Sequence, residues 1–218
     1  MPRTATIAVV LGTAAAVLAA RRADAWQRDH GALPAERIAT LPGDELLPAA
    51  HEVTTRATGI AAPPGRVWPW VAQLGQDRGG FYSLTWIENA LGAQIRNADR
   101  IHPEWQERAV GDRVRGDPQR VAWEVVHWDP PRALVLRGAG PSAPAREGVA
   151  AGPFDFVWAI VVEPDGAGGS RLVARERFAH DGTALGRAVV AALARGSWPM
   201  TRAMLRGIRR RAEGAGGD

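Results

Sequence analysis

The chain has 218 residues, enough for one domain with a substantial core, and its 46% hydrophobic and 23% charged residues exclude a disordered protein. It has no cysteine, which excludes a disulfide scaffold, a thiolate metal site and a cysteine nucleophile. All 27 basic residues are arginine, so the net charge of +4 persists to high pH and is weak evidence for a nucleic-acid partner.

The N-terminal segment differs in composition from the rest. Residues 5–20 carry no charge and are followed at once by Arg21 and Arg22. As a helix this run reaches about 24 Å, a little less than the roughly 30 Å of a bilayer core. The favoured interpretation of residues 1–22 is a single membrane anchor, with the domain on the cytoplasmic side because more arginines follow the run than precede it. The alternatives are a signal peptide cleaved near Ala25, which would make the protein secreted, and an alanine-rich helix packed on the domain.

Residues 23–50 are predicted to be a linker with at most one short helix. Pro34, Pro42 and Pro48 interrupt any long helix, and large apolar side chains are few. We therefore expect the folded domain to begin near His51 and to span residues 51–213, with a disordered tail at 214–218.

From residue 51 onward the pattern predicts one strand, two helices, several strands and a long helix. A strand is expected at 51–61, a helix from Pro63-Pro64 to Gly75 and a second helix at 84–91. Five strands then follow at 113–115, 120–128, 133–137, 154–163 and 170–180, and a long helix begins after the cap at 181–183. This order excludes a doubly wound parallel sheet and predicts an α+β fold in which a curved antiparallel sheet wraps around the C-terminal helix.

Strict alternation divides the last strand into two faces. Three arginines on one face predict that it is solvent-exposed, and it comprises Arg171, Val173, Arg175 and Arg177. The inward face then comprises Leu172, Ala174, Glu176, Phe178 and His180. A buried carboxylate is costly without a partner, so Glu176 is expected either to meet an arginine, such as Arg137 or Arg100, or to line a wet cavity.

The preceding strand carries an apolar and aromatic row. Its members are Phe154, Phe156, Trp158, Ile160 and Val162. If this row shares the interior with Glu176, the interior is broad and sparsely polar, as an apolar ligand pocket requires. A solid core that happens to use tryptophan is the alternative.

The segment from the end of the first predicted helix to the strands at 113 and beyond carries a recognisable motif. It reads GGFYS-x-x-W-x-E-N-x-x-G at 79–92, I-x-N-A-D-R-I-x-P-E-W-Q at 95–106 and GD-x-V at 111–114. Together with ALVLRG at 133–138 and MLRGIRRRAE at 204–213, it resembles a bacterial branch of the START/Bet v 1-like (SRPBCC) superfamily, the polyketide cyclase/dehydrase and lipid transport proteins.

The resemblance implies a helix-grip fold with an internal cavity, but no single reaction, because the superfamily contains carriers, sensors and cyclases. The ligand-binding candidates are aromatic or polar residues of the motif and of the inner strands: Tyr82, Trp86, Asn89, Arg100, Trp105, Trp123, Arg137, Phe156, Trp158, Glu176 and His180. The favoured function is a membrane-tethered module, anchored through residues 5–20, that binds or transfers a hydrophobic or amphiphilic small molecule such as a lipid or a polyketide-like compound. No metal and no cofactor are expected.

Two alternatives stay open. One is a cyclase or dehydratase acting on a polyketide-like or aromatic substrate, with Glu176 or His102 as the catalytic candidate. An unpaired Glu176 among apolar neighbours would have a raised pKa, as a general acid needs. His102 with Glu104 is a weaker acid–base pair, and a polar loop that fastens the motif explains it as well. The other alternative is a protein-interaction module without catalytic activity.

Overall fold

The computed structural model describes residues 16, 18–118, 121–138 and 154–214. After a helix at 18–28, the elements follow in this order: α2 (Pro34–Ile38), a 3-10 turn (Asp44–Leu46), β1 (Glu52–Ile60), α3 (Pro64–Ala72), α4 (Thr85–Ala90), a second 3-10 turn (Pro103–Trp105), β2 (Arg113–Arg115), β3 (Ala122–Asp129), β4 (Ala133–Gly138), β5 (Phe154–Pro164), β6 (Ser170–His180) and α5 (Ala184–Gly214).

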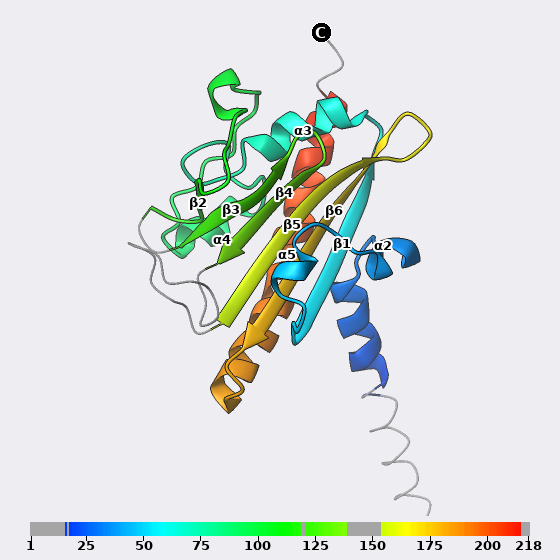
Figure 1. Ribbon diagram of the computed structural model, residues 1–218, viewed down its shortest axis with the longest axis vertical. Coiled ribbons are helices and arrows are strands. Elements are labelled where there is room, and N and C mark those ends of the chain that lie inside the picture. The colour runs from blue at the N-terminus through cyan, green and yellow to red at the C-terminus, as the bar shows by residue number, and fades with distance from the viewer. Residues whose placement is uncertain (1–15, 17, 119–120, 139–153, 215–218) are drawn as a thin grey trace, which may run out of the picture.

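The predicted α+β helix-grip architecture is confirmed. The six strands form one sheet in the order β1-β6-β5-β4-β3-β2, and every neighbouring pair is antiparallel. Helix α5, orange to red in Figure 1, crosses one face of this sheet, which we call the inner face. Strands β2 and β6 have the predicted bounds, and the others differ from the prediction by one or two residues at an end.

Local chemistry explains the three longest elements, β5, β6 and α5. The β5–β6 hairpin turns through Gly166 and Gly168, both at positive φ, while the Asp165 carboxylate accepts backbone hydrogen bonds from Ala167 and Gly169. Helix α5 begins where the Thr183 hydroxyl accepts the Gly186 N–H, and it continues through Pro199 for 31 residues.

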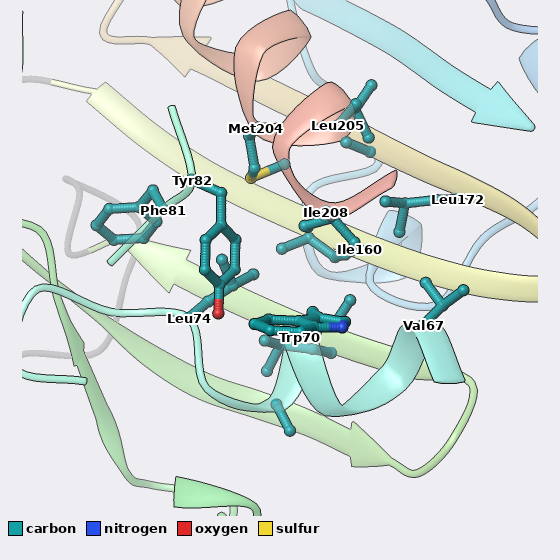
Figure 2. Close-up of a cluster of buried hydrophobic side chains, with 14 of the residues drawn as sticks. Val67, Trp70, Leu74, Phe81, Tyr82, Ile160, Leu172, Met204, Leu205 and Ile208 are labelled. Atoms are coloured by element: carbon teal, nitrogen blue, oxygen red, sulfur yellow. The ribbon is translucent and has the colours of Figure 1, made fainter. Parts of the chain in front are cut away.

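The inner-face core is densest under the second half of α5. Figure 2 shows Met204, Leu205 and Ile208 of that helix facing Trp70 of α3 and Ile160 of β5. The contact is close at Gly207, where an added Cβ would lie 2.7 Å from the Tyr82 Cβ. A glycine is therefore needed at position 207 for α5 to approach the segment at 79–84, which we call the motif loop.

The outer face of the sheet differs from the prediction, because it is covered. Residues 32–50, blue in Figure 1, cross this face, and Ala32, Leu41 and Leu47 join its buried apolar cluster with Val135 and Val157. We call residues 32–50 the strap. The segment 23–50, expected to be a linker, therefore packs as part of the folded unit.

The three outer-face arginines of β6, expected to face solvent, bind the strap. Arg171 pairs with Glu36 at 2.6 Å, while Arg175 and Arg177 share the carboxylate of Asp44 at 2.6 and 3.2 Å. Arg175 is only 3% exposed and also donates to the carbonyls of residues 36, 37 and 39. A guanidinium has five donors in a rigid fork, so it can satisfy the carbonyls of an irregular segment that has no ladder of its own.

The helix at 18–28 lies beside the β1 edge of the sheet (Figure 1). It contacts α5 through Trp26, whose ring centroid lies 5.5 Å from that of Trp198. In the described part of the chain, no helix is long and apolar enough to cross a membrane. Most of the predicted anchor at 5–20, and the predicted tail after Gly214, lie outside the described residues.

Candidate functional site

Aromatic side chains gather on the inner face, where β3, β5 and β6 pass the motif loop. Trp123, Phe81 and Trp158 form a triangle with ring centroids 5.8 to 6.2 Å apart. Phe156 lies 6.4 Å from Trp123 and 4.8 Å from Phe178, which extends the row toward the first half of α5. We call these five residues the aromatic wall. It brings together three of the predicted ligand-binding residues, Trp123, Phe156 and Trp158.

The wall contains an unused hydrogen-bond donor. Trp158 is 8% exposed, and its indole Nε1 has no hydrogen-bond partner among the described residues. A buried indole N–H usually finds an acceptor, and leaving it unpaired costs free energy. Trp123 and Phe156 are only half-buried, so the wall is less completely packed than the core under the second half of α5.

Glu176 lies next to the wall, opposite Trp158 in the β5–β6 register, and its charge is fully paired. Its Oε2 accepts from Arg56 Nη1 at 2.8 Å, from the Ser197 hydroxyl at 2.6 Å and from the Thr54 hydroxyl at 3.0 Å. Its Oε1 accepts from the Thr201 hydroxyl at 2.9 Å. The expectation that Glu176 meets an arginine is therefore correct, but the arginine is neither Arg137 nor Arg100.

Arg56 is a residue that the sequence reasoning missed. Its side chain is 1% exposed and also donates to the carbonyls of Gln27 and Ala194, so it joins the N-terminal helix, β1 and α5. The sequence did carry one signal: Arg56 is in the centre of the opening strand, two residues from Thr54 and on the same face. An arginine in the middle of a strand needs an acidic partner if its face is buried.

The two arginines that were proposed as partners lie elsewhere. Arg137 shares the face of Ala133 and Val135 in β4, which is the outer face, because side chains alternate along a strand. The Arg100 side chain is exposed, and its carbonyl accepts from Gln73. The arginine that meets Glu176 is Arg56, so the carboxyl is not unpaired.

Residues of the motif and its surroundings form hydrogen bonds at the end of α3, and we call this network the brace. Gln73 donates to the Tyr82 hydroxyl at 2.9 Å and accepts the His102 N–H at 3.1 Å. Arg108 is buried and donates to the carbonyl of Ala72, the last residue of α3, and to that of Leu74 just after the helix. Burial, followed by the nearby Arg78, lowers the pKa of Arg108 to about 10. Sequence reasoning did not single out Gln73 or Arg108.

Tyr82 belongs to the same brace, whereas Asn89 and Glu88 hold the segments on either side of α4. Tyr82 is 2% exposed, and burial raises the pKa of its hydroxyl well above the usual value. The Asn89 side chain accepts the Ile95 N–H and donates to the Ile95 carbonyl, which closes the loop after α4. Glu88 accepts from the Ser83 hydroxyl, and its pKa is raised by burial.

The remaining predicted residues lie apart from the wall. Trp86 is 72% exposed. His102 stacks on Trp105 with centroids 4.1 Å apart, and its Nδ1 lies 3.2 Å from the exposed Glu104 carboxylate. His180 is at the end of β6 and stacks on His51 at 3.7 Å. The predicted sites thus separate into the aromatic wall, the Glu176 network, the brace and isolated surface positions.

The residues that the structure describes contain no group of three or more histidine and carboxylate side chains that could hold a metal ion.

Comparison with known proteins gives one family. The family described as "Polyketide cyclase / dehydrase and lipid transport" matches residues 50–213. No curated protein sequence matches the chain.

Solved structures resemble the chain at low sequence identity. A protein from Arthrobacter aurescens is 14% identical, with 74% of this chain and 86% of that chain covered and a TM-score of 0.44. A conserved protein from Geobacillus kaustophilus is 12% identical, with 75% and 97% covered and a TM-score of 0.41. The di-domain ARO/CYC protein BexL from the BE-7585A biosynthetic pathway is 14% identical, with 77% and 48% covered and a TM-score of 0.41.

Proposed function

Since the chain belongs to the polyketide cyclase/dehydrase and lipid transport family of SRPBCC domains, we propose that it is a binding module for a hydrophobic or amphiphilic small molecule. The ligand lies against the aromatic wall, between the sheet and the first half of α5. The observation that carries this proposal is the wall itself, five aromatic side chains on one face with an unpartnered indole N–H among them. Apolar surface with a single polar group is the usual lining of a small-molecule site.

The chemistry of the wall favours a neutral group on the ligand at this point. Glu176 is the carboxylate beside Trp158, and both of its oxygens are already used by Arg56 and by three hydroxyl groups. The donor that remains is the Trp158 N–H, which pairs with a carbonyl or hydroxyl oxygen. An apolar body with one such oxygen fits both a lipid and a polyketide-like compound.

The role that we propose is holding or carrying the ligand rather than converting it. The catalytic alternative gains no support from Glu176, since both of its carboxylate oxygens are already occupied by hydrogen bonds within the protein. His102 and Glu104 lie at the brace, away from the wall. We further propose that residues 5–20 tether the domain to a membrane from its cytoplasmic side, as the apolar run and the arginines after it suggest.

Native mass spectrometry of the full chain, purified without added ligand, tests the binding proposal. We expect a bound mass that organic extraction identifies as a lipid or another apolar compound. Trp123→Leu, which removes a half-buried ring of the wall, should lower the bound fraction at least severalfold. The matched control is Trp86→Leu, because Trp86 is 72% exposed and outside the wall. A wild-type chain that stays free of ligand across a panel of lipids and aromatic polyketides would contradict the proposal.

A further inference from the structure

Unpartnered polar atoms are concentrated where the helix at 18–28 meets α5. Among the described residues, His30 Nδ1, Trp198 Nε1 and Arg202 Nε are buried atoms without a hydrogen-bond partner. The His30 ring centroid lies 6.2 Å from that of Trp198, and the Arg202 guanidinium carbon lies 5.6 Å from the Trp198 ring. Three unpaired groups therefore lie in one cluster: His30 in the turn after the helix at 18–28, and Trp198 and Arg202 on α5. Burying such atoms without partners is costly, which makes the cluster a candidate site.

The charge at this point is positive. Within the described part of the chain, Arg202 and Arg206 have no ion-pair partner, and the nearby carboxylate of Asp24 is already shared by Arg28 and Arg195. Arg56 is neutralised by Glu176. Burial is the main cause that lowers the pKa of His30, followed by the positive charges of Arg202, Arg206 and Arg56. The missing component is therefore an anion.

We infer that His30, Trp198 and Arg202 form a binding site for a phosphate group. An arginine Nε–H and an indole N–H donate to a phosphate oxygen, and so does His30 in the tautomer that carries its proton on Nδ1. A phosphate offers several oxygens to neighbouring donors of this kind. Trp26 is 54% exposed and its ring centroid lies 4.6 Å from that of His30, so a partly exposed aromatic ring borders the cluster.

The site is separate from the aromatic wall and does not depend on the proposed ligand. It lies between α5 and the helix that leads directly back to the apolar run at 5–20, so a lipid headgroup and a soluble phosphate compound are both available sources. The chemistry recognised is the same for the two sources, and the experiment below separates them.

The test measures binding of inorganic phosphate to the full chain by isothermal titration calorimetry at constant ionic strength. We expect saturable binding that weakens at least about tenfold in Arg202→Gln, which corresponds to about 1.4 kcal/mol. Trp198→Phe, which keeps the ring but loses the N–H, should weaken binding in the same direction. Arg210→Gln is the control, because Arg210 is exposed on the same helix and the variant loses the same charge. Circular dichroism and thermal unfolding establish that each variant is folded.

Co-sedimentation with vesicles distinguishes the two sources. Vesicles of phosphatidylcholine with phosphatidic acid are compared with vesicles of phosphatidylcholine alone. A gain in bound protein on phosphatidic acid that Arg202→Gln abolishes and Arg210→Gln preserves assigns the site to a headgroup. Phosphate binding that depends on Arg202, without such a gain, assigns it to a soluble phosphate compound. Absence of phosphate binding, or equal losses in Arg202→Gln and Arg210→Gln, overturns the inference.

Discussion

The substitution Glu176→Gln tests the buried network at the centre of the fold. It removes the charge that neutralises Arg56 but keeps the size of the side chain, so the effect reports electrostatics and hydrogen bonding rather than a cavity. The side chains of Arg56 and Glu176 are 1% and 5% exposed, so water cannot replace the lost partner. Removing one member of a buried ion pair typically costs about 3–5 kcal/mol.

That loss is large compared with the stability of a domain, which is about 5–15 kcal/mol. For a chain of this size it corresponds to a fall in Tm of about 6–20 °C. The free energy of unfolding is measured by urea titration, followed by far-UV circular dichroism. The control is Arg209→Gln, which breaks a half-exposed pair with Glu213 on α5 and should cost no more than about 0.5 kcal/mol.

A double-mutant cycle makes the prediction specific to the pair. Arg56→Gln with Glu176→Gln leaves no unpaired buried charge, so the double variant should be more stable than the sum of the single effects by about 0.5–3 kcal/mol. A loss below about 1 kcal/mol in Glu176→Gln, or a double variant that equals the sum, would refute the reasoning.

Three further predictions follow from close contacts and charges. Gly207→Ala should destabilise the protein by about 1–3 kcal/mol because the added methyl group meets Tyr82. Gly196→Ala, at an open position of the same helix, should instead stabilise the protein by about 0.4–1 kcal/mol. Similar Tm shifts in the two variants would contradict this prediction. Asp44→Asn should release the strap, seen as faster hydrogen exchange of amides at 36–47, and unchanged exchange would count against its ionic attachment. Because the pKa of His30 is lowered in the folded state, the unfolded state binds the proton more readily, and stability falls as the pH drops through about 6.5. The urea midpoint of the wild type should therefore decrease over this pH range, and it should decrease less in His30→Gln.

The order and type of the elements could be predicted from the sequence alone. Alternation over 170–180 and the glycine-rich turn at 165–169 define the β5–β6 hairpin, because side-chain period and positive φ are local properties. Alternation also gave β5 one aromatic row without deciding which face it takes, and in the structure Trp123, Phe156 and Trp158 meet on the inner face.

Local pattern could not say what lies opposite a side chain. Alternation placed Arg171, Arg175 and Arg177 on one face of β6 and Glu176 on the other, and both placements are correct. The strap that covers the arginines begins more than 130 positions earlier in the chain, and Arg56 is 120 positions from Glu176. The motif likewise predicted the family, while the structure shows that the Tyr82 hydroxyl accepts from Gln73 and that Asn89 is bonded to the backbone of Ile95.

The sequence by itself determined the strands and helices from residue 51 onward, the alternation of side chains along β5 and β6 and the family that the domain resembles. The tertiary structure decided the partners: Arg56 for Glu176, the strap for the β6 arginines, and α5 for the helix at 18–28. The physical reason is that backbone preference and side-chain alternation act over a few residues. Burial and charge pairing depend instead on which distant segments the completed sheet brings together.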